Sequence, residues 1–199
     1  MAPVIPDPQR VRSFEDGPAF EAWLATHHAS ERELWLKIHK KGSGLPTVTY
    51  AEALDVALCW GWIDGLKKSF DEASFLQRFT PRKPRSVWSQ VNRAHVARLI
   101  TAGRMTEHGQ RHVEAAKADG RWDSAYAPSS QMTIPEDLAA AIKAVPEALA
   151  TFEQLTKQNV YALAYRTRSV KTASARAVKI QTFVAMLARG ETIYPQKAQ

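Results

Sequence analysis

Alternating hydrophobic and polar residues predict strands in the first half of the chain. Within residues 34–40, Leu34, Leu36 and Ile38 point to one side and the residues between them to the other, as in a half-buried strand. Residues 60–70 and 75–82 have the same character, and the short polar stretch between them is typical of a turn. These two segments predict a hairpin, with residues 34–40 as a third strand beside it.

Helical spacing accounts for most of the remaining chain. Thr49 and Glu52 form a capping-box pattern before an apolar run, which predicts a largely buried helix. The predicted helices cover residues 14–28, 49–60, 86–103, 106–120, 135–144, 146–155, 157–169 and 173–189. The sequence therefore predicts an α+β fold: a small antiparallel β-sheet with flanking helices, followed by an all-helical C-terminal region.

The order of these elements also predicts where the chain divides. We expect an α+β domain over residues 13–126 and a helical C-terminal region over residues 134–195, with the boundary near 127–134. Residues 1–12 are expected to form a loose leader, because Pro3, Pro6 and Pro8 interrupt any regular element there.

Composition narrows the class of protein. Hydrophobic residues make up 45% of the chain, which indicates a globular protein, and the single cysteine, Cys59, excludes an internal disulfide framework. The first residues lack the apolar run of a secretory signal, and no stretch is long enough for a membrane span, so a cytoplasmic location is predicted. Cys59 falls within a predicted buried helix and is expected to be an inert thiol. The six histidines show no metal-binding spacing, so we predict neither a metal site nor a cofactor.

Positive charge is concentrated in one part of the sequence. The net charge is +7, and residues 67–104 contain nine lysines and arginines against two acids, Asp71 and Glu72. This concentration favours an anionic partner, although a solvated basic face would give the same pattern. The cations cluster and do not form a long stripe, so nucleic-acid binding is expected to be absent or weak.

The stretch CWGWIDGLKKSF, residues 59–70, contains the sharpest candidate for chemistry. Asp64 shares a predicted strand face with Trp60, Trp62 and Leu66, and a carboxylate in apolar surroundings must find a partner or change its pKa. Asp64 is therefore the candidate catalytic residue, and the alternative is a structural carboxylate paired with an arginine. The two tryptophans are either core residues or surfaces on which a planar ligand stacks.

The segment FTPRKPRS, residues 79–86, predicts an anion site beside Asp64. Arg78, Arg82 and Arg85 lie in or next to a loop stiffened by two prolines, and arginine suits phosphate or carboxylate groups. We expect this loop to keep Arg82 and Arg85 in water. The full set of predicted ligand-binding residues is Trp60, Trp62, Asp64, Arg78, Arg82, Arg85, Ser86, Trp88 and Asn92.

Long adjoining motifs give the chain a resemblance to a known family. The segments EALDVALCWGWIDG, FTPRKPRSVWSQVN, GRMTEHG and AAKADGRWDSAY, with the ending LARGETIYP, resemble the bacterial YdeI/OmpD-associated family of bacteriocin-protection proteins. The resemblance extends over residues 13–195. Trp60 stands where the family pattern has phenylalanine, and the stretch KTASARAVKI departs from the pattern but keeps Arg176. The resemblance implies protection against bacteriocins or other antimicrobial peptides as part of a stress response, and it brings no catalytic residue with it.

These observations lead to one functional expectation and two alternatives. We expect a protection factor that binds an anionic small molecule near Asp64 and the Arg78–Arg85 loop. The first alternative is an enzyme acting on a phosphate- or carboxylate-bearing substrate, with Asp64 as acid or base and the arginines as charge stabilisers. The second is a weak nucleic-acid-binding protein. A homodimer is left open.

Overall fold

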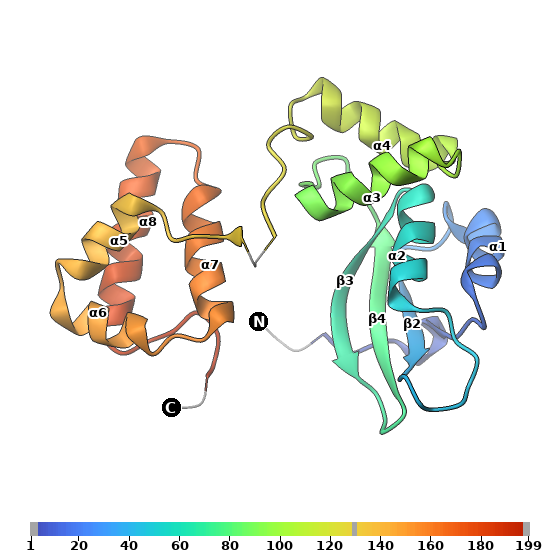
Figure 1. The fold of residues 1–199 in the computed structure, drawn as a ribbon, viewed down its shortest axis with the longest axis horizontal. Coiled ribbons are helices and arrows are strands. Elements are labelled where there is room, and N and C mark those ends of the chain that lie inside the picture. Colours follow the sequence, from blue (N-terminus) through green and yellow to red (C-terminus); the bar gives the residue numbers. More distant parts are fainter. Residues whose placement is uncertain (1–3, 129–130, 197–199) are drawn as a thin grey trace. The chain divides into compact units, whose positions relative to one another are not determined.

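The computed structural model describes residues 4–128 and 131–196, which fall into two compact units divided between Tyr126 and Ala127. The first unit is a sheet with helices, and the second is entirely helical (Figure 1). The predicted α+β class with a helical C-terminal region is therefore confirmed. None of the helices in the described residues is long and apolar enough to cross a membrane.

The elements of the first unit follow the predicted order closely. They are η1 (Pro8–Arg10), β1 (Val11–Arg12), α1 (Gly17–His27), β2 (Leu34–His39), α2 (Tyr50–Cys59), β3 (Trp62–Ser69), β4 (Ser74–Pro81), α3 (Gln90–Thr101) and α4 (Glu107–Ala118).

The sheet contains one strand that the sequence did not predict. Within the described residues its order is β1-β2-β4-β3, with β3 and β4 forming the predicted hairpin and β2 antiparallel to β4. Residues Val11 and Arg12 pair in parallel with Trp35 and Leu36, so the sheet is mixed and not purely antiparallel. The prediction of a loose leader over residues 1–12 is thus wrong for its last residues, because a two-residue strand is too short to leave a periodic pattern.

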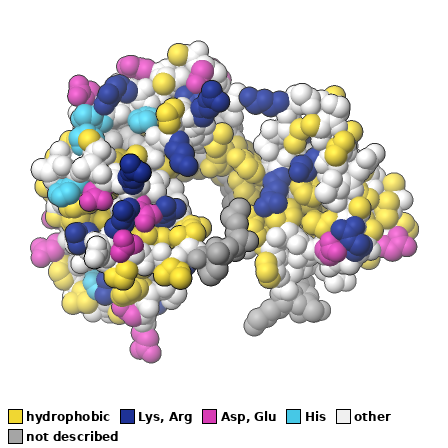
Figure 2. All heavy atoms as spheres, turned by 180° about the vertical axis from the view of Figure 1, so that it is seen from behind, with side chains coloured by type: hydrophobic (Ala, Val, Ile, Leu, Met, Phe, Trp, Pro, Cys, Tyr) yellow, Lys and Arg dark blue, Asp and Glu magenta, His cyan; other side chains and the backbone are white. Residues whose placement is uncertain are grey.

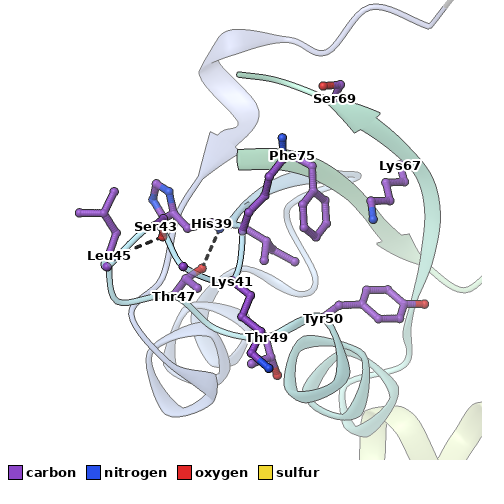
Figure 3. A pocket seen from close by; sticks show the side chains of 14 residues that line it. His39, Lys41, Ser43, Leu45, Thr47, Thr49, Tyr50, Lys67, Ser69 and Phe75 are labelled. Carbon is purple, nitrogen blue, oxygen red and sulfur yellow. Dashed lines mark hydrogen bonds between the residues drawn. The ribbon is translucent and has the colours of Figure 1, made fainter. Parts of the chain in front are cut away.

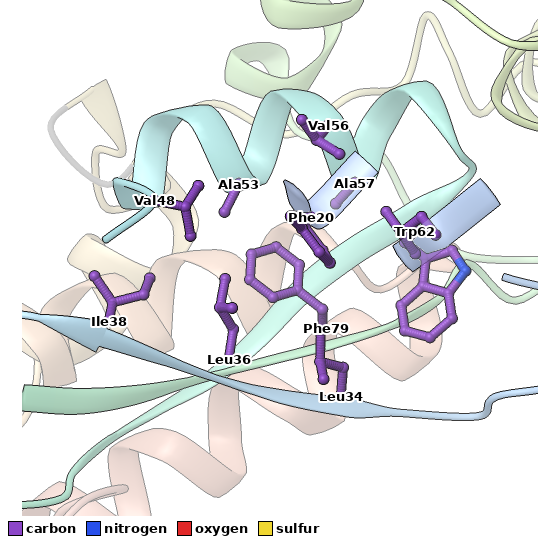
Figure 4. Packing of buried hydrophobic residues seen from close by; sticks show 11 residues of the cluster. Phe20, Leu34, Leu36, Ile38, Val48, Ala53, Val56, Ala57, Trp62 and Phe79 are labelled. Atoms are coloured by element: carbon purple, nitrogen blue, oxygen red, sulfur yellow. The ribbon is translucent and has the colours of Figure 1, made fainter. Parts of the chain in front are cut away.

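One face of the sheet forms the main hydrophobic core. Helices α1 and α2 cover this face (Figure 1), and Figure 4 shows Phe20 of α1 between α2 and Leu36 and Phe79 of the sheet. The capping box predicted at the start of α2 is present, because Thr49 and Glu52 bond each other's backbone amides. Burial of a side chain such as Phe20 or Leu36 contributes roughly 1.5–3 kcal/mol to folding. This cluster therefore stabilises the packing of α1 and α2 on the sheet.

A second cluster joins α2, α3 and α4. It contains Leu54 and Leu58 of α2, Leu99 of α3, Val113 of α4 and Trp88 of the preceding loop. Helix α3 begins at Gln90 and not at the predicted Ser86, because the hydroxyl of Ser89 caps the helix by accepting the amide proton of Asn92. Ser86 therefore lies in the loop.

The second unit is a small bundle of helices with its own core. Its elements are α5 (Glu136–Lys143), α6 (Pro146–Glu153), α7 (Lys157–Arg168) and α8 (Ala173–Ala188), all close to the predicted ranges. Leu138, Ile142, Leu163, Phe183 and Leu187 are buried together.

Candidate functional site

The motif CWGWIDG is divided between a helix end, a turn and a strand. Cys59 and Trp60 close α2, Gly61 turns the chain with φ of +73°, and Trp62 and Asp64 belong to β3. Cys59 is a buried free cysteine, and burial raises its pKa to about 11, which favours the predicted inert thiol. Trp62 is 1% exposed and donates its indole N–H to the carbonyl oxygen of His28, so it is a core residue at the edge of a pocket.

Asp64 is held by a tyrosine and not by an arginine. The Tyr50 hydroxyl donates to Asp64 Oδ2 at 2.8 Å. Burial raises the pKa of Tyr50 well above its ordinary value, and the hydrogen bond and negative charge of Asp64 raise it further. Tyr50 therefore stays a neutral hydrogen-bond donor beside a carboxylate.

Arg78 is part of an ion pair on the side of the sheet opposite Asp64. In the register of β4, Arg78 pairs with Trp35 whereas Phe79 pairs with Asp64, so consecutive residues of the strand place the two side chains on different faces. Its Nη2 lies 2.5 Å and its Nε 2.8 Å from Glu33 Oε2. Arg78 thus joins β4 to Glu33, the residue that precedes β2.

Arg82 is buried, contrary to the expectation that the proline-flanked loop would keep it in water. The side chain is 5% exposed, lies 3.6 Å from the centre of the Trp88 ring, and donates to the carbonyl oxygen of Val87 at 2.8 Å. Burial lowers its pKa to about 10, and the nearby positive charge of Arg121 adds to this. The cation is buried because its guanidinium plane covers Trp88, itself 2% exposed.

The remaining predicted residues have separate roles around the loop. Arg85 is exposed, as expected. The Ser86 hydroxyl accepts the amide proton of Lys83, and its carbonyl oxygen accepts a bond from Arg121. Asn92 is half-buried, and its backbone amide is the one that Ser89 caps. The nine predicted residues thus lie on different faces and do not line one common pocket among those described below.

The largest pocket described lies between the loop after β2 and the hairpin. We call it the loop pocket; its volume is about 780 Å³, and Figure 3 shows the Lys67 amine next to the Phe75 ring in its lining. The Lys67 nitrogen is 4.0 Å from the ring centre. The pocket is lined by Ile38, His39, Lys40, Lys41, Gly42, Ser43, Gly44, Leu45, Thr47, Thr49, Tyr50, Lys67, Ser69 and Phe75.

The lining of the loop pocket is basic and free of carboxylates. Lys40 is engaged with the carbonyl oxygens of Asp71 and Glu72, at 3.3 and 2.9 Å, whereas Lys67 rests on Phe75. Tyr50 connects this pocket to Asp64, since the same side chain lines the pocket and donates to the carboxylate. The candidate functional site is therefore next to Asp64, but on the side away from Arg78.

A smaller pocket lies where α4 approaches the end of α2. We call it the histidine pocket; it measures about 260 Å³ and is lined by His28, Ala29, Trp60, Gly61, Trp62, Pro81, His108, Arg111 and His112. Trp60 and Trp62, two of the three tryptophans predicted as ligand-binding residues, thus belong to this pocket, whereas Trp88 does not. In the residues that the structure describes, no group of three or more His, Cys, Asp or Glu side chains is arranged to hold a metal ion.

Carboxylates pair with part of the positive charge of residues 67–104. Figure 2 shows Lys and Arg side chains of the first unit interspersed with acidic side chains and histidines. Three of its arginines have carboxylate partners: Arg78 with Glu33, Arg98 with Asp55 at 2.6 Å, and Arg93 with Asp123 at 3.9 Å. The charge excess of the sequence is therefore partly neutralised locally.

Comparison with protein families assigns the two units to different models. Residues 12–112, just over half of the chain, match the model described as a domain of unknown function (DUF8412). The chain belongs to this family. Residues 131–190 match a second model, described as Bacteriocin-protection, YdeI or OmpD-Associated. No curated protein and no solved structure matches the chain.

For this DUF8412-family chain, the predicted resemblance to the YdeI/OmpD-associated family is confirmed for residues 131–190. The predicted extent of 13–195 is too wide, because the sheet unit matches a different family model. The second match connects the chain with a bacteriocin-protection-related role. Within the matched part, Arg176 has a structural role: it binds Asp137 through two bonds of 2.6 and 2.9 Å and also donates to the carbonyl oxygen of Thr167.

Sequence reasoning missed most of the residues that line the pockets of this DUF8412 domain. Lys67, Phe75, His28, His108 and Arg111 come from separate elements, and their proximity depends on how those elements pack. The sequence did contain a signal for one pocket residue, Tyr50. Tyr50 follows the predicted cap Thr49, so its place at the start of α2, near the loop, could have been inferred.

Proposed function

We propose that this protein contributes to bacteriocin protection by binding a small anionic molecule in the loop pocket. The observation that carries the proposal is a pocket of about 780 Å³ lined by lysines and hydroxyl groups, with no carboxylate in its lining. Pockets of roughly 300–1,000 Å³ suit small organic ligands. The ligand expected here has a negatively charged group and an apolar or planar part.

The lining residues support both halves of that ligand. Lys67 and Lys41 offer positive charge at the rim, while Phe75, Ile38 and Leu45 offer apolar surface. Lys67 already lies over the Phe75 ring, so a planar anion could contact the ring and the amine together. Tyr50, fixed by Asp64, adds a neutral donor at the edge.

Binding is favoured over the enzyme alternative by the partners of Asp64 and of two arginines. Asp64 accepts a hydrogen bond from the Tyr50 hydroxyl. Two of the three arginines expected to stabilise charge beside Asp64 are engaged elsewhere, Arg78 with Glu33 and Arg82 with Trp88. Partial neutralisation of the basic region also supports the expectation that nucleic acid binds weakly or not at all. A cytoplasmic location, a stress-response role and a homodimer remain predictions.

The test uses 1-naphthoate, a planar carboxylate, with neutral 1-naphthamide as the charge control. We expect saturable naphthoate binding by fluorescence or calorimetry, and weaker binding of the amide by up to about fivefold, since a contact with the exposed Lys67 amine contributes up to about 1 kcal/mol. Lys67→Gln should weaken naphthoate binding by a similar factor.

The matched control is the neighbouring lysine. Lys68 follows Lys67 in β3, faces the other side of the sheet and bonds the carbonyl oxygen of Val4, so Lys68→Gln should leave binding unchanged. Equal affinity for naphthoate and naphthamide, or equal loss in the two lysine variants, would rule out an anion site in the loop pocket.

A further inference from the structure

The histidine pocket gathers positive charge without a lining carboxylate. His28 comes from the end of α1, and His108, Arg111 and His112 come from the first turns of α4. The His28 and His108 rings are 4.0 Å apart between centres, and His108 stacks on Trp60 at 5.5 Å with 14° between the ring planes. Titratable donors from two elements therefore face one small space.

The hydrogen bonds of two imidazoles define which ring nitrogens remain for a ligand. Arg111 donates to His108 Nδ1 at 2.8 Å, and because arginine cannot accept, the neutral His108 carries its proton on Nε2. His28 Nδ1 lies 3.0 Å from the carbonyl oxygen of Leu24 and donates to it, so Nε2 of His28 gains a proton only in the charged form. Each ring thus has Nε2 as a donor when protonated, and at His108 an oxyanion must compete with the exposed Glu107 carboxylate, whose Oε1 lies 3.7 Å from Nε2.

Close backbone packing holds this arrangement in place. A Cβ atom on Gly109 would lie 2.3 Å from the carbonyl oxygen of Cys59, and one on Gly61 would lie 2.7 Å from the His112 ring. The start of α4 therefore sits directly on the end of α2, and the pocket is preformed.

Arg82, whose guanidinium is buried on Trp88, is joined to the histidine pocket through its backbone. Arg82 is 5% exposed, and its backbone amide donates to the carbonyl oxygen of Gly61, which lines the pocket. Over residues 4–128 and 131–196, no carboxylate oxygen lies within 4.0 Å of its side chain. Asp64 and Tyr126 act on this charge from within the fold, and its positive charge in turn lowers the pKa of His112, so Arg82 adds to the attraction of the pocket for an anion without lining it.

We propose that the histidine pocket binds a tetrahedral oxyanion through Arg111 and the imidazoles of His28, His108 and His112. The chemistry is that of sulfate, inorganic phosphate or the terminal phosphate of a small molecule. A volume of about 260 Å³ suits such a group better than a larger organic ligand. The site differs in position and lining from the loop pocket and does not depend on it.

The proposal implies a definite dependence on pH. Burial lowers the pKa of His108, the charges of His28 and Arg111 lower it further, and Glu107 opposes them. Burial also lowers the pKa of His112, with Arg82, Arg111 and Arg121 adding to the effect. An oxyanion stabilises the imidazolium forms and raises these pKa values, so binding takes up protons. Affinity should therefore rise as pH falls and be lost as pH rises through the pKa values of the complex.

The test is a sulfate titration of the full chain at pH 5.5 and 7.5, followed by NMR of the histidine rings. Sulfate does not titrate in this range, and chloride at equal ionic strength controls for screening. We expect saturable shifts of the His28, His108 and His112 signals, with affinity at least about tenfold tighter at pH 5.5, corresponding to an average uptake of about half a proton over the two pH units. Parallel titrations with inorganic phosphate and glycerol 3-phosphate at pH 5.5 show whether the oxyanion is preferred free or attached, and either order supports the shared chemistry.

Arg111→Gln should weaken sulfate binding by at least about fivefold, because it removes a charge-assisted donor. Arg104→Gln, which removes an exposed arginine outside the pocket, should have no effect. Absence of saturable histidine shifts at pH 5.5 would overturn the proposal, as would equal losses in the two arginine variants. Naphthoate binding by the Arg111→Gln chain separates this outcome from a failure of the loop pocket.

Discussion

Arg82 combines a full positive charge with almost complete burial. Its guanidinium covers the Trp88 ring at 3.6 Å, and one of its nitrogens holds the carbonyl oxygen of Val87 at 2.8 Å. The pKa lowered to about 10 still leaves the group charged near neutral pH. At this residue the cation serves as a packing element for the loop between β4 and α3.

Removing that packing should destabilise the protein. Arg82→Ala leaves the Trp88 ring uncovered and the Val87 carbonyl unpaired, which should lower the free energy of unfolding by roughly 2–4 kcal/mol. Urea melts followed by tryptophan fluorescence measure the change. Arg85→Ala, three residues along the same loop but exposed, should melt like the parent chain. Similar midpoints for the two variants would show that the Arg82 stack contributes little.

The sequence predicted the residues of this region better than their partners. It singled out Asp64 as a carboxylate that needs a partner, but the partner is the Tyr50 hydroxyl, fourteen positions away, and not an arginine. It also treated Arg82 and Arg85 alike, since both lie beside prolines. Their difference depends on Trp88, whose position is set by the packing of α3 and α4, and no local pattern encodes that.

At the scale of elements, the contact between α4 and α2 is the tightest backbone approach among the described glycines. The carbonyl oxygens of Cys59 and Leu58 lie 2.3 and 2.6 Å from where a Cβ on Gly109 would stand. Thr106, the cap of α4, also donates to the Cys59 carbonyl at 2.6 Å. The end of α2 and the start of α4 are thus bonded and packed as one joint.

Adding a methyl group at Gly109, where α4 contacts α2, should lower the stability of the protein although alanine favours helices. Gly109→Ala gains up to about 1 kcal/mol of helix propensity, but it forces two backbones apart, and overpacking of this kind costs typically about 1–3 kcal/mol. We expect a net loss of stability in thermal or urea melts, together with perturbed His112 NMR signals. Gly17→Ala is the matched control, because its Cβ would meet only ordinary contacts at 3.8 Å. A Gly109→Ala chain as stable as the Gly17→Ala chain would contradict the close approach.

Helices and strands with strong periodicity or clear caps could be predicted from the sequence, whereas the contacts between them could not. The ranges of β2, α2, and the helices of the second unit agree with the alternation, the capping box and the helical spacing of the sequence. The start of α3 was misplaced because Ser86 and Ser89 are both acceptable caps, and the choice depends on where the loop packs. Gly109 gave no local sign that a neighbouring backbone requires it.

At the scale of the whole molecule, each unit has its own hydrophobic core and its own family match. The first unit has clusters around Phe20 and around Leu99, and the second has a cluster around Leu138 and Phe183. Separate cores of this kind are the usual sign of segments that fold on their own.

We therefore predict that a fragment of residues 127–199 folds without the sheet unit. It should give a helical circular dichroism spectrum and a cooperative melt, since the Asp137–Arg176 pair and the core around Leu138 are entirely internal to it. The change Leu138→Ala should lower its stability by roughly 2–5 kcal/mol, enough to unfold so small a bundle. A non-cooperative melt of the parent fragment would mean that the helices need the rest of the chain.

The short strand β1 has a consequence for how the protein behaves at high concentration. Val11 and Arg12 occupy backbone groups of Trp35 and Leu36 that would otherwise be an open template for another chain. At the opposite edge, β3 is irregular between Asp64 and Lys67 and carries two adjacent lysines, which resist growth of the sheet from that side. Both borders of the sheet thus discourage fibre-like association, and two copies of this chain would have to meet through surfaces other than a continued sheet.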